Sequence, residues 1–285
     1  MLRRLVVLVP IIALLTGCLI APVKGPAPLR YRDEVFADVA VTSDIYYGTA
    51  IGQLDEEVTL MFDFYEPVDD PETRRPLIIW IHGGSFKTGS RTSPELVDQA
   101  NIFARHGYAN ASISYRLSAN GCSSPNAECI QAIIDSRIDA QSAVRFFRAN
   151  AEGYGIDPDR IVVAGTSAGA IAALGVAYNG ESPGDGDHQE FSSSVRGAVA
   201  LSGASILSGA INPSDAPVLM FHGTNDSLVP YAWAKDTLRI ARENGLGAYL
   251  VTYQGAGHVP YVANRAEILD LENNFFYRSL DLAHK

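Results

Sequence analysis

Short apolar runs alternate with longer segments of helical periodicity along most of this 285-residue chain. Several of the short runs, among them Leu77–His82 and Arg160–Ala164, are apolar almost throughout. Such runs are typical of strands that are covered on both faces. The predicted strands are Val58–Tyr65, Leu77–His82, Tyr108–Tyr115, Arg160–Ala164, Val195–Ser202, Val218–His222 and Ala248–Tyr253.

Segments of helical length separate most of the later strands. This alternation predicts an α/β fold with a mostly parallel sheet and helices on both faces. The earliest apolar runs, Val35–Val41 and Val58–Tyr65, have no helix between them, so we expect them to begin the sheet as an antiparallel meander. The predicted helices are Pro94–Arg105, Ala127–Asn150, Ala168–Tyr178, Tyr231–Asn244 and Pro260–Leu282.

The N-terminus has the layout of a secretory signal peptide. Arg3 and Arg4 precede the apolar run Leu5–Leu15. The following Leu15-Thr16-Gly17-Cys18 resembles the bacterial lipobox, which implies cleavage before Cys18, acylation of that residue and export to a bacterial membrane. Leu19 after the Cys implies sorting to the outer membrane of a Gram-negative host. The alternative is an uncleaved membrane anchor, for which roughly 20 apolar residues are needed.

The expected domain organisation has three parts. Residues 1–17 form the signal peptide, residues 18–32 a lipidated Cys and flexible, Pro-rich tether, and residues 33–285 a single folded domain. The formal net charge of −10 argues against a nucleic-acid partner, because phosphate binding needs a basic surface. No cluster of metal ligands stands out, and we expect no cofactor. The lipid anchor is the only expected membrane contact, and the oligomeric state is left open.

The sequence Gly165-Thr166-Ser167-Ala168-Gly169 lies between a predicted strand and a helix rich in Ala. In this strand–turn–helix context, G-x-S-x-G is the pattern of a nucleophile elbow. Glycines flank the tight turn, and the helix N-terminus stabilises negative charge. The pattern predicts Ser167 as a catalytic nucleophile, against the alternative of an ordinary glycine-rich turn.

A serine nucleophile needs a base, and the base needs an orienting acid. Of the six histidines, His82, His222 and His258 lie at strand ends. Of these three, only His258 occupies the loop between the last predicted strand and the final helix, where this arrangement must present its base. Asp226 lies four residues after a strand end, whereas Asp236 falls inside the next helix. The order Ser167, Asp226, His258 matches the order that the elbow pattern requires.

The sequence His82-Gly83-Gly84-Ser85-Phe86 follows another strand and predicts an oxyanion hole. Backbone N–H groups stabilise a developing oxyanion well because their direction is fixed in advance. We assign the donors to Gly84 or Ser85, together with Ala168. His82 and His222, which also end strands, are interpreted as structural residues.

These motifs resemble those of the carboxylesterase and lipase branch of the α/β-hydrolase family, over residues 57–280. The resemblance implies hydrolysis of carboxylic esters through an acyl-enzyme intermediate. Relatives often carry a helical cap, but only Gly203–Pro217 joins the two strands where one is commonly inserted. We therefore expect no large cap domain and an open site that takes short-acyl or polysaccharide-linked esters. A prolyl-oligopeptidase-like peptidase and a catalytically inactive binding lipoprotein are the alternatives.

The remaining cysteines, Cys122 and Cys129, lie in one loop and are expected to form a disulfide in an oxidising compartment. The alternative is two free thiols. Because the preceding strand ends at the carboxyl edge of the sheet, this loop should form one wall of the site. Four aromatic residues near strand ends are further candidates for lining a pocket: Phe86, Tyr115, Trp233 and Tyr261.

Overall fold

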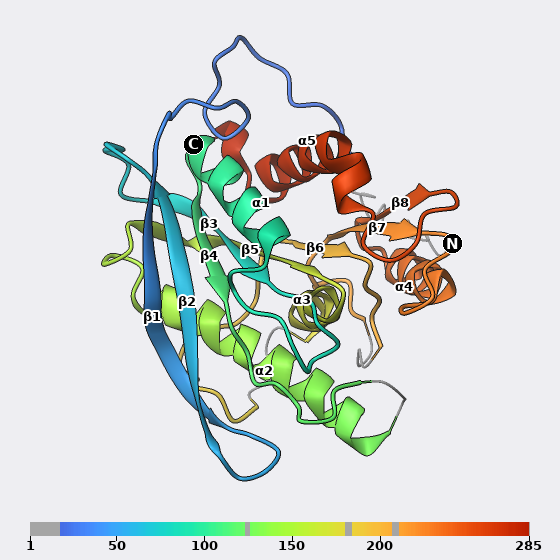
Figure 1. Ribbon diagram of the computed structural model, residues 1–285. Helices are drawn as coiled ribbons and strands as arrows, with labels where there is room; N and C mark the ends of the chain where they lie inside the picture. Colours follow the sequence, from blue (N-terminus) through green and yellow to red (C-terminus); the bar gives the residue numbers. More distant parts are fainter. Residues whose placement is uncertain (1–17, 123–125, 180–183, 207–210, 285) are drawn as a thin grey trace, which may run out of the picture.

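An eight-stranded mixed sheet runs through the centre of the computed structural model (Figure 1). The strand order is β1-β2-β4-β3-β5-β6-β7-β8. Strand β2 is antiparallel to β1 and β4, and all neighbours from β4 to β8 are parallel. The predicted mostly parallel sheet with an antiparallel start is confirmed. The structure describes residues 18–122, 126–179, 184–206 and 211–284.

The strands are β1 (Val39–Ile51), β2 (Glu57–Pro67), β3 (Arg75–Ile81), β4 (Ala109–Ile113), β5 (Ile156–Thr166), β6 (Ala198–Leu201), β7 (Val218–Gly223) and β8 (Ala248–Tyr253). The helices are α1 (Pro94–Arg105), α2 (Ala127–Ala149), α3 (Ala168–Tyr178), α4 (Tyr231–Glu243) and α5 (Tyr261–Ser279), with a short 3₁₀ turn at Leu282–His284. In the parts of the chain that the structure describes between β6 and β7, no helix is present.

Helices cover both faces of the sheet. Leu77, Ile79 and Ile81 of β3 point into the core formed with α2 and α3. Ile78 and Trp80 point into the opposite core, formed with α1 and α5. Because successive strand residues face opposite sides, a strand buried between two helical layers must be apolar at every position.

Strand β1 is much longer than predicted, since it continues from Val39 to Ile51. Its middle is exposed and polar, and at Asp44 the pairing with β2 is interrupted and φ is +60°. The Asp44 N–H donates to a carboxylate oxygen of Asp63 at 3.0 Å, which holds this irregularity on β2. Polar residues and a bulge are common on edge strands, and they hid this strand from the hydrophobic pattern.

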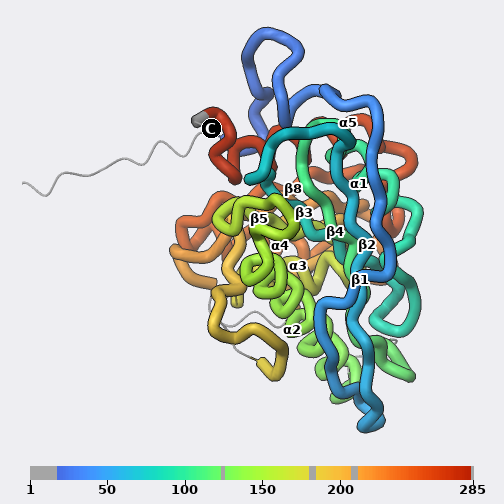
Figure 2. The backbone as a smooth tube through the Cα atoms, turned by 90° about the vertical axis from the view of Figure 1, so that its left-hand side faces the viewer, coloured from blue at the N-terminus to red at the C-terminus, as the bar shows by residue number. Residues whose placement is uncertain are grey.

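The segment at residues 18–32, which we expected to be a flexible tether, is attached to the domain. The Leu19 N–H donates to the Tyr249 hydroxyl at 3.0 Å, and the Val23 N–H donates to the Asn274 side chain at 2.8 Å. Arg278 of α5 donates to two further carbonyl oxygens of the segment. Four apolar side chains of the segment also pack against the core beside α5, so the tether prediction is wrong (Figure 2).

No helix of the described residues is both long enough and apolar enough to cross a bilayer.

A buried ion pair ties the segment after β4 to α2. Arg116 is 3% exposed, and its guanidinium lies 2.9 Å from a carboxylate oxygen of Asp139. The Arg116 backbone N–H donates to the other oxygen of Asp139 at 2.7 Å. The same guanidinium donates to the Ile51 carbonyl and to Asp185, so four separate segments meet at one cation.

Replacement of Asp139 by Asn should therefore destabilise the fold. Removing one partner of a buried pair typically costs 3–5 kcal/mol, and we expect about 3 kcal/mol because Asp185 remains. Urea unfolding measures the loss. The matched control is Asp236→Asn on the exposed face of α4, which should stay within about 0.5 kcal/mol of the unmodified chain. Equal effects of the two substitutions would contradict the importance of the buried pair.

Candidate active site

Ser167 lies in a sharp turn between β5 and α3. Its φ of +56° and ψ of −115° place a non-glycine residue in a strained region of conformational space. A Cβ atom added to Gly165 would lie 2.3 Å from the Gly169 carbonyl oxygen. A Cβ atom added to Gly169 would lie 2.0 Å from the carbonyl oxygen of Ile81. Both glycines are therefore required by the close approach of backbone, as the elbow pattern predicts.

The structure brings together the three residues predicted as a triad. The Ser167 Oγ atom lies 2.8 Å from Nε2 of His258. The Nδ1 atom of the same ring lies 2.8 Å from Oδ2 of Asp226. Because an ionised carboxylate only accepts hydrogen bonds, Nδ1–H donates to Asp226 and Nε2 is left to accept the serine hydroxyl. This is the arrangement that a general base requires.

Asp226 is held in place by its own loop. Its Oδ1 atom accepts hydrogen bonds from the backbone N–H groups of Leu228 and Val229, each at 2.9 Å. Its side chain is fully buried. Asp236, the competing acid, is 65% exposed on α4 and faces Arg239. Among the described residues, the Asp236 carboxylate makes no hydrogen bond or ion pair with Ser167 or His258.

The two other strand-end histidines are buried and bonded to backbone. Nε2 of His222 lies 2.8 Å from the Val229 carbonyl oxygen and 3.2 Å from Oδ2 of Asp226, so the ring supports the acid loop. His82 stacks on the Tyr115 ring, and its Nδ1 lies 2.7 Å from the Gly83 carbonyl oxygen. Burial lowers the pKa of His82, which keeps the ring neutral near pH 7. Both environments agree with structural roles.

The loop after β3 lies directly over the elbow. A Cβ atom added to Gly83 would lie 3.2 Å from Cβ of Ser167, so only glycine fits without displacement. Ser85 and Ala168 both line the pocket that contains Ser167, whereas Gly84 does not. Among the described residues, neither the Ser85 N–H nor the Ala168 N–H donates to another group. The Gly84 N–H also has no acceptor among the described residues, so it is the lining of the pocket that favours Ser85 over Gly84.

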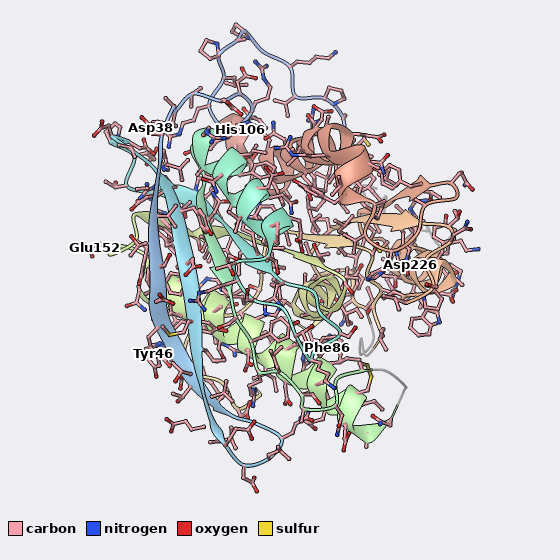
Figure 3. The ribbon with its side chains drawn as sticks, in the orientation of Figure 1. Asp38, Tyr46, Phe86, His106, Glu152 and Asp226 are labelled. Carbon is pink, nitrogen blue, oxygen red and sulfur yellow. A yellow bond between two sulfur atoms is a disulfide. The ribbon has the colours of Figure 1, made fainter. Side chains whose placement is uncertain are left out.

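Ser167 opens into a pocket of about 610 Å³. Of the four aromatic candidates, Phe86 and Trp233 line this pocket. Phe86 and Asp226 are labelled in Figure 3. Tyr115 is buried against His82, and the Tyr261 hydroxyl donates to Asp98 at 2.8 Å away from the pocket. The sequence did not reveal the wall of isoleucines that α2, α3 and the segment after β6 contribute: Ile130, Ile133, Ile171 and Ile206.

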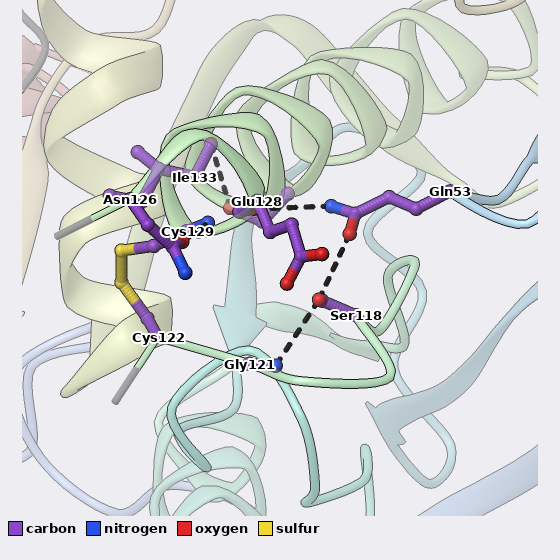
Figure 4. Close-up of a disulfide and its surroundings, with 9 residues drawn as sticks. Gln53, Ser118, Gly121, Cys122, Asn126, Glu128, Cys129 and Ile133 are labelled. Carbon is purple, nitrogen blue, oxygen red and sulfur yellow. Dashed lines mark hydrogen bonds between the residues drawn. A yellow bond between two sulfur atoms is a disulfide. The ribbon is translucent and has the colours of Figure 1, made fainter. Parts of the chain in front are cut away.

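A disulfide joins Cys122 to Cys129, and both residues line the same pocket (Figure 4). The Cys122 N–H donates to the carbonyl oxygen of Ser85 at 3.0 Å. Asn126 caps α2 by accepting the N–H of Cys129 at 2.8 Å. The disulfide therefore fastens the loop that carries Ser85 to the first turn of α2. Among the described residues, no three His, Cys, Asp or Glu side chains form a group that could hold a metal ion.

Comparison with known proteins agrees with this geometry. Residues 62–205, about half of the chain, match the BD-FAE family of α/β-hydrolases, and residues 200–274 match a model for TAP-like proteins. The chain belongs to the BD-FAE family. The first match spans the oxyanion loop and the elbow, and the second spans the predicted acid and base.

Individual relatives are esterases and related hydrolases. The para-nitrobenzyl esterase of Bacillus subtilis is 35% identical over 113 residues, which cover 37% of this chain and 22% of that protein. The phenmedipham hydrolase of Pseudarthrobacter oxydans is 37% identical over 106 residues, or 35% of this chain and 20% of the relative. The chain thus matches about a fifth of the length of these curated relatives.

A solved structure matches over nearly its whole length. The propionate-bound esterase Est2 of Thermogutta terrifontis has a TM-score of 0.64 and 25% identity, covering 90% of this chain and 95% of that one. Together with the curated relatives, it supports the assignment of this chain as a carboxylic ester hydrolase.

Loss of the disulfide should lower the rate of hydrolysis most for bulky substrates, because Cys122 and Cys129 form part of the pocket wall. In the double variant Cys122→Ser, Cys129→Ser, we expect a several-fold lower kcat/KM for bulky acyl esters and a smaller change for p-nitrophenyl acetate. Steady-state kinetics measure both values, and thermal unfolding provides the control for stability. Equal losses on the two substrates would mean that the disulfide serves stability alone.

Proposed function

We propose that this chain is a serine esterase that hydrolyses carboxylic esters through an acyl-enzyme intermediate. The observation that carries the proposal is the pair of 2.8 Å contacts that connects Ser167, His258 and Asp226. The esterase relatives support the same reaction class. They do not favour the peptidase alternative, and the complete triad geometry does not favour an inactive binding protein.

In the proposed mechanism, Ser167 Oγ attacks the ester carbonyl carbon while its proton passes to Nε2 of His258. Asp226 stabilises the imidazolium that forms. The carbonyl oxygen becomes an oxyanion, which accepts hydrogen bonds from the N–H groups of Ser85 and Ala168. Loss of one such donor typically costs about 3 kcal/mol of transition-state stabilisation.

Collapse of this intermediate breaks the bond to the alcohol oxygen, and His258 gives its proton to the leaving alcohol. Water then attacks the acyl-enzyme, with His258 again accepting a proton and returning it to Ser167. The sequence favoured short-acyl or polysaccharide-linked esters. The pocket of about 610 Å³ has a wall of isoleucines and leaves room for a longer apolar group beside the ester, so we extend the proposed substrates to esters of that kind.

We also propose that Cys18 is the lipidated first residue of an exported protein, on the outer membrane of a Gram-negative host. The support is the apolar run that ends in Leu15-Thr16-Gly17-Cys18, of which residues 1–17 lie outside the described part of the chain. Cys18 is exposed and takes part in no disulfide. Because Leu19 is already bonded to Tyr249 beside β8, the lipid would hold the catalytic domain close to the membrane.

The lipid proposal predicts the mass of the mature protein. Intact mass spectrometry of membrane-extracted material should find an acylated terminus at Cys18, and Cys18→Ser should leave an unacylated product. An unmodified protein that begins at Met1 would contradict this part of the proposal. The esterase assignment does not depend on it.

The proposed triad predicts how strongly substitution of each of its three residues lowers the esterase activity. Ser167→Ala and His258→Ala should each abolish measurable hydrolysis of p-nitrophenyl acyl esters, and Asp226→Asn should lose less because Asp226 orients the base. A fluorophosphonate probe should label the unmodified chain at Ser167 and fail to label Ser167→Ala. Circular dichroism checks that each variant is folded.

The matched control for the acid is Asp236→Asn, which changes an exposed carboxylate on α4. Its activity should equal that of the unmodified chain. If Asp236→Asn were as damaging as Asp226→Asn, the assignment of the acid would be wrong.

A further inference from the structure

A second, smaller pocket of about 220 Å³ adjoins the catalytic pocket, in the region where α2 and α3 lie side by side (Figures 1 and 2). The residues that line both pockets are all isoleucines: Ile130, Ile133, Ile171 and Ile206. A continuous apolar wall therefore leads from the nucleophile into the second pocket. Beyond this wall, the second pocket is lined by Ile134, Arg137, Gly175, Asn179 and Ser205, and we call it the side pocket.

Arg137 is the charged residue among the described residues that line the side pocket. In the described parts of the chain, no hydrogen bond or ion pair reaches its side chain, although it is about half buried. The stem of Arg137 lies across α3 at Gly175, where an added Cβ atom would come within 3.2 Å of its Cγ. Burial lowers the pKa of Arg137, which reflects a cation partly removed from water without compensation. Such a cation gains strongly from an anionic ligand.

Ser205 supplies a second observation at the same place. Its Oγ atom is buried without a hydrogen-bond partner, even though its backbone N–H donates to Thr237 at 2.9 Å. Buried polar groups are normally paired, and an unpaired one in a native structure calls for a ligand or water. The side pocket is thus lined by Arg137, by Asn179 and by Ser205, whose unpaired Oγ atom is itself buried, among residues that are otherwise apolar or glycine.

We propose that the side pocket binds a carboxylate at the far end of an apolar group whose ester lies at Ser167. This inference rests on the proposed esterase function and names a substrate class for it: esters that carry an anionic carboxylate. A planar guanidinium matches a carboxylate in geometry and can donate two parallel hydrogen bonds to it. The net charge of −10 disfavours more highly charged groups than a single carboxylate.

The helix geometry defines the spacer that such a substrate needs. Gly175, against which Arg137 lies, is about two turns of α3 beyond Ser167, which corresponds to roughly 12 Å along the helix axis. A short acyl group cannot span this distance. A longer alkyl or aryl group can follow the isoleucine wall and place its carboxylate beside Arg137.

The test compares two series of esters with the full chain. The first contains p-nitrophenyl monoesters of straight-chain dicarboxylic acids from succinate to sebacate, and the second contains p-nitrophenyl esters of the neutral acids of equal length. A parallel arm uses acetate esters of ω-hydroxy acids, which carry the carboxylate on the alcohol side. We expect the longer members of one carboxylate series to exceed their neutral counterparts in kcat/KM.

Arg137→Gln should remove this preference. We expect kcat/KM for the preferred carboxylate esters to fall about tenfold or more, mainly through a higher KM, as for a lost charge-assisted hydrogen bond. Neutral esters should change less than about twofold, because Arg137 lies away from the reacting atoms. Arg137→Lys should recover part of the loss. The matched control is Arg239→Gln on α4, which removes an exposed arginine from another part of the molecule and should leave both series unchanged.

The outcomes separate the two proposals. If the chain hydrolyses neutral esters but prefers neither carboxylate series, the side-pocket proposal is overturned and the esterase function stands. Equal losses on neutral and carboxylate esters in Arg137→Gln would also overturn it, because Arg137 would then act only on the fold. Calorimetry with sebacate monomethyl ester and the Ser167→Ala variant, which lacks the proposed nucleophile, tests the site without catalysis. Binding that is absent, or that survives Arg137→Gln, would overturn the proposal even in a chain that hydrolyses no ester.

Discussion

The close approach of three backbone segments around Ser167 determines how the rest of the site can be built. The carbonyl oxygen of Ile81, at the end of β3, lies where a side chain on Gly169 would have to be. On the same side, Gly83 of the next loop lies against the Cβ atom of Ser167. The strained turn is stable because the sheet holds β3 and β5 as direct neighbours beneath it. The proposed nucleophile and the proposed oxyanion loop are therefore positioned by the same pair of strands.

The three residues that we propose as the catalytic triad could be found in the sequence because each one lies at the carboxyl end of a strand. Ser167 follows β5, Asp226 follows β7 and His258 follows β8, and parallel strands bring their carboxyl ends to one edge of the sheet. Strand positions are in turn fixed by apolar runs, which are the most reliable signal in an α/β sequence. The sequence could not choose between Gly84 and Ser85, because that choice depends on how the loop turns in space.

Features that depend on contacts between distant segments were not predictable. The Pro-rich residues after Cys18 have the composition of a linker, yet they pack beside α5 because Asn274 and Arg278 provide partners for their backbone. The isoleucine wall was equally hidden, since Ile130 and Ile171 lie on different helices and look like ordinary core residues in each. The composition of a segment indicates which local conformations it can adopt. These contacts depend instead on the side chains of a neighbouring element that is distant in the sequence.

The contrast between two arginines shows why the side pocket stands out from the rest of the fold. Arg116 is almost fully buried, and carboxylates from Asp139 and Asp185 surround its guanidinium. Arg137 is less buried, but no carboxylate of the described residues faces it, although acidic residues outnumber basic ones in this chain by 32 to 22. At Arg116 the fold therefore supplies the anions itself. Around Arg137 the described residues supply a largely apolar wall and no anion, which is the environment expected when the anion belongs to a ligand.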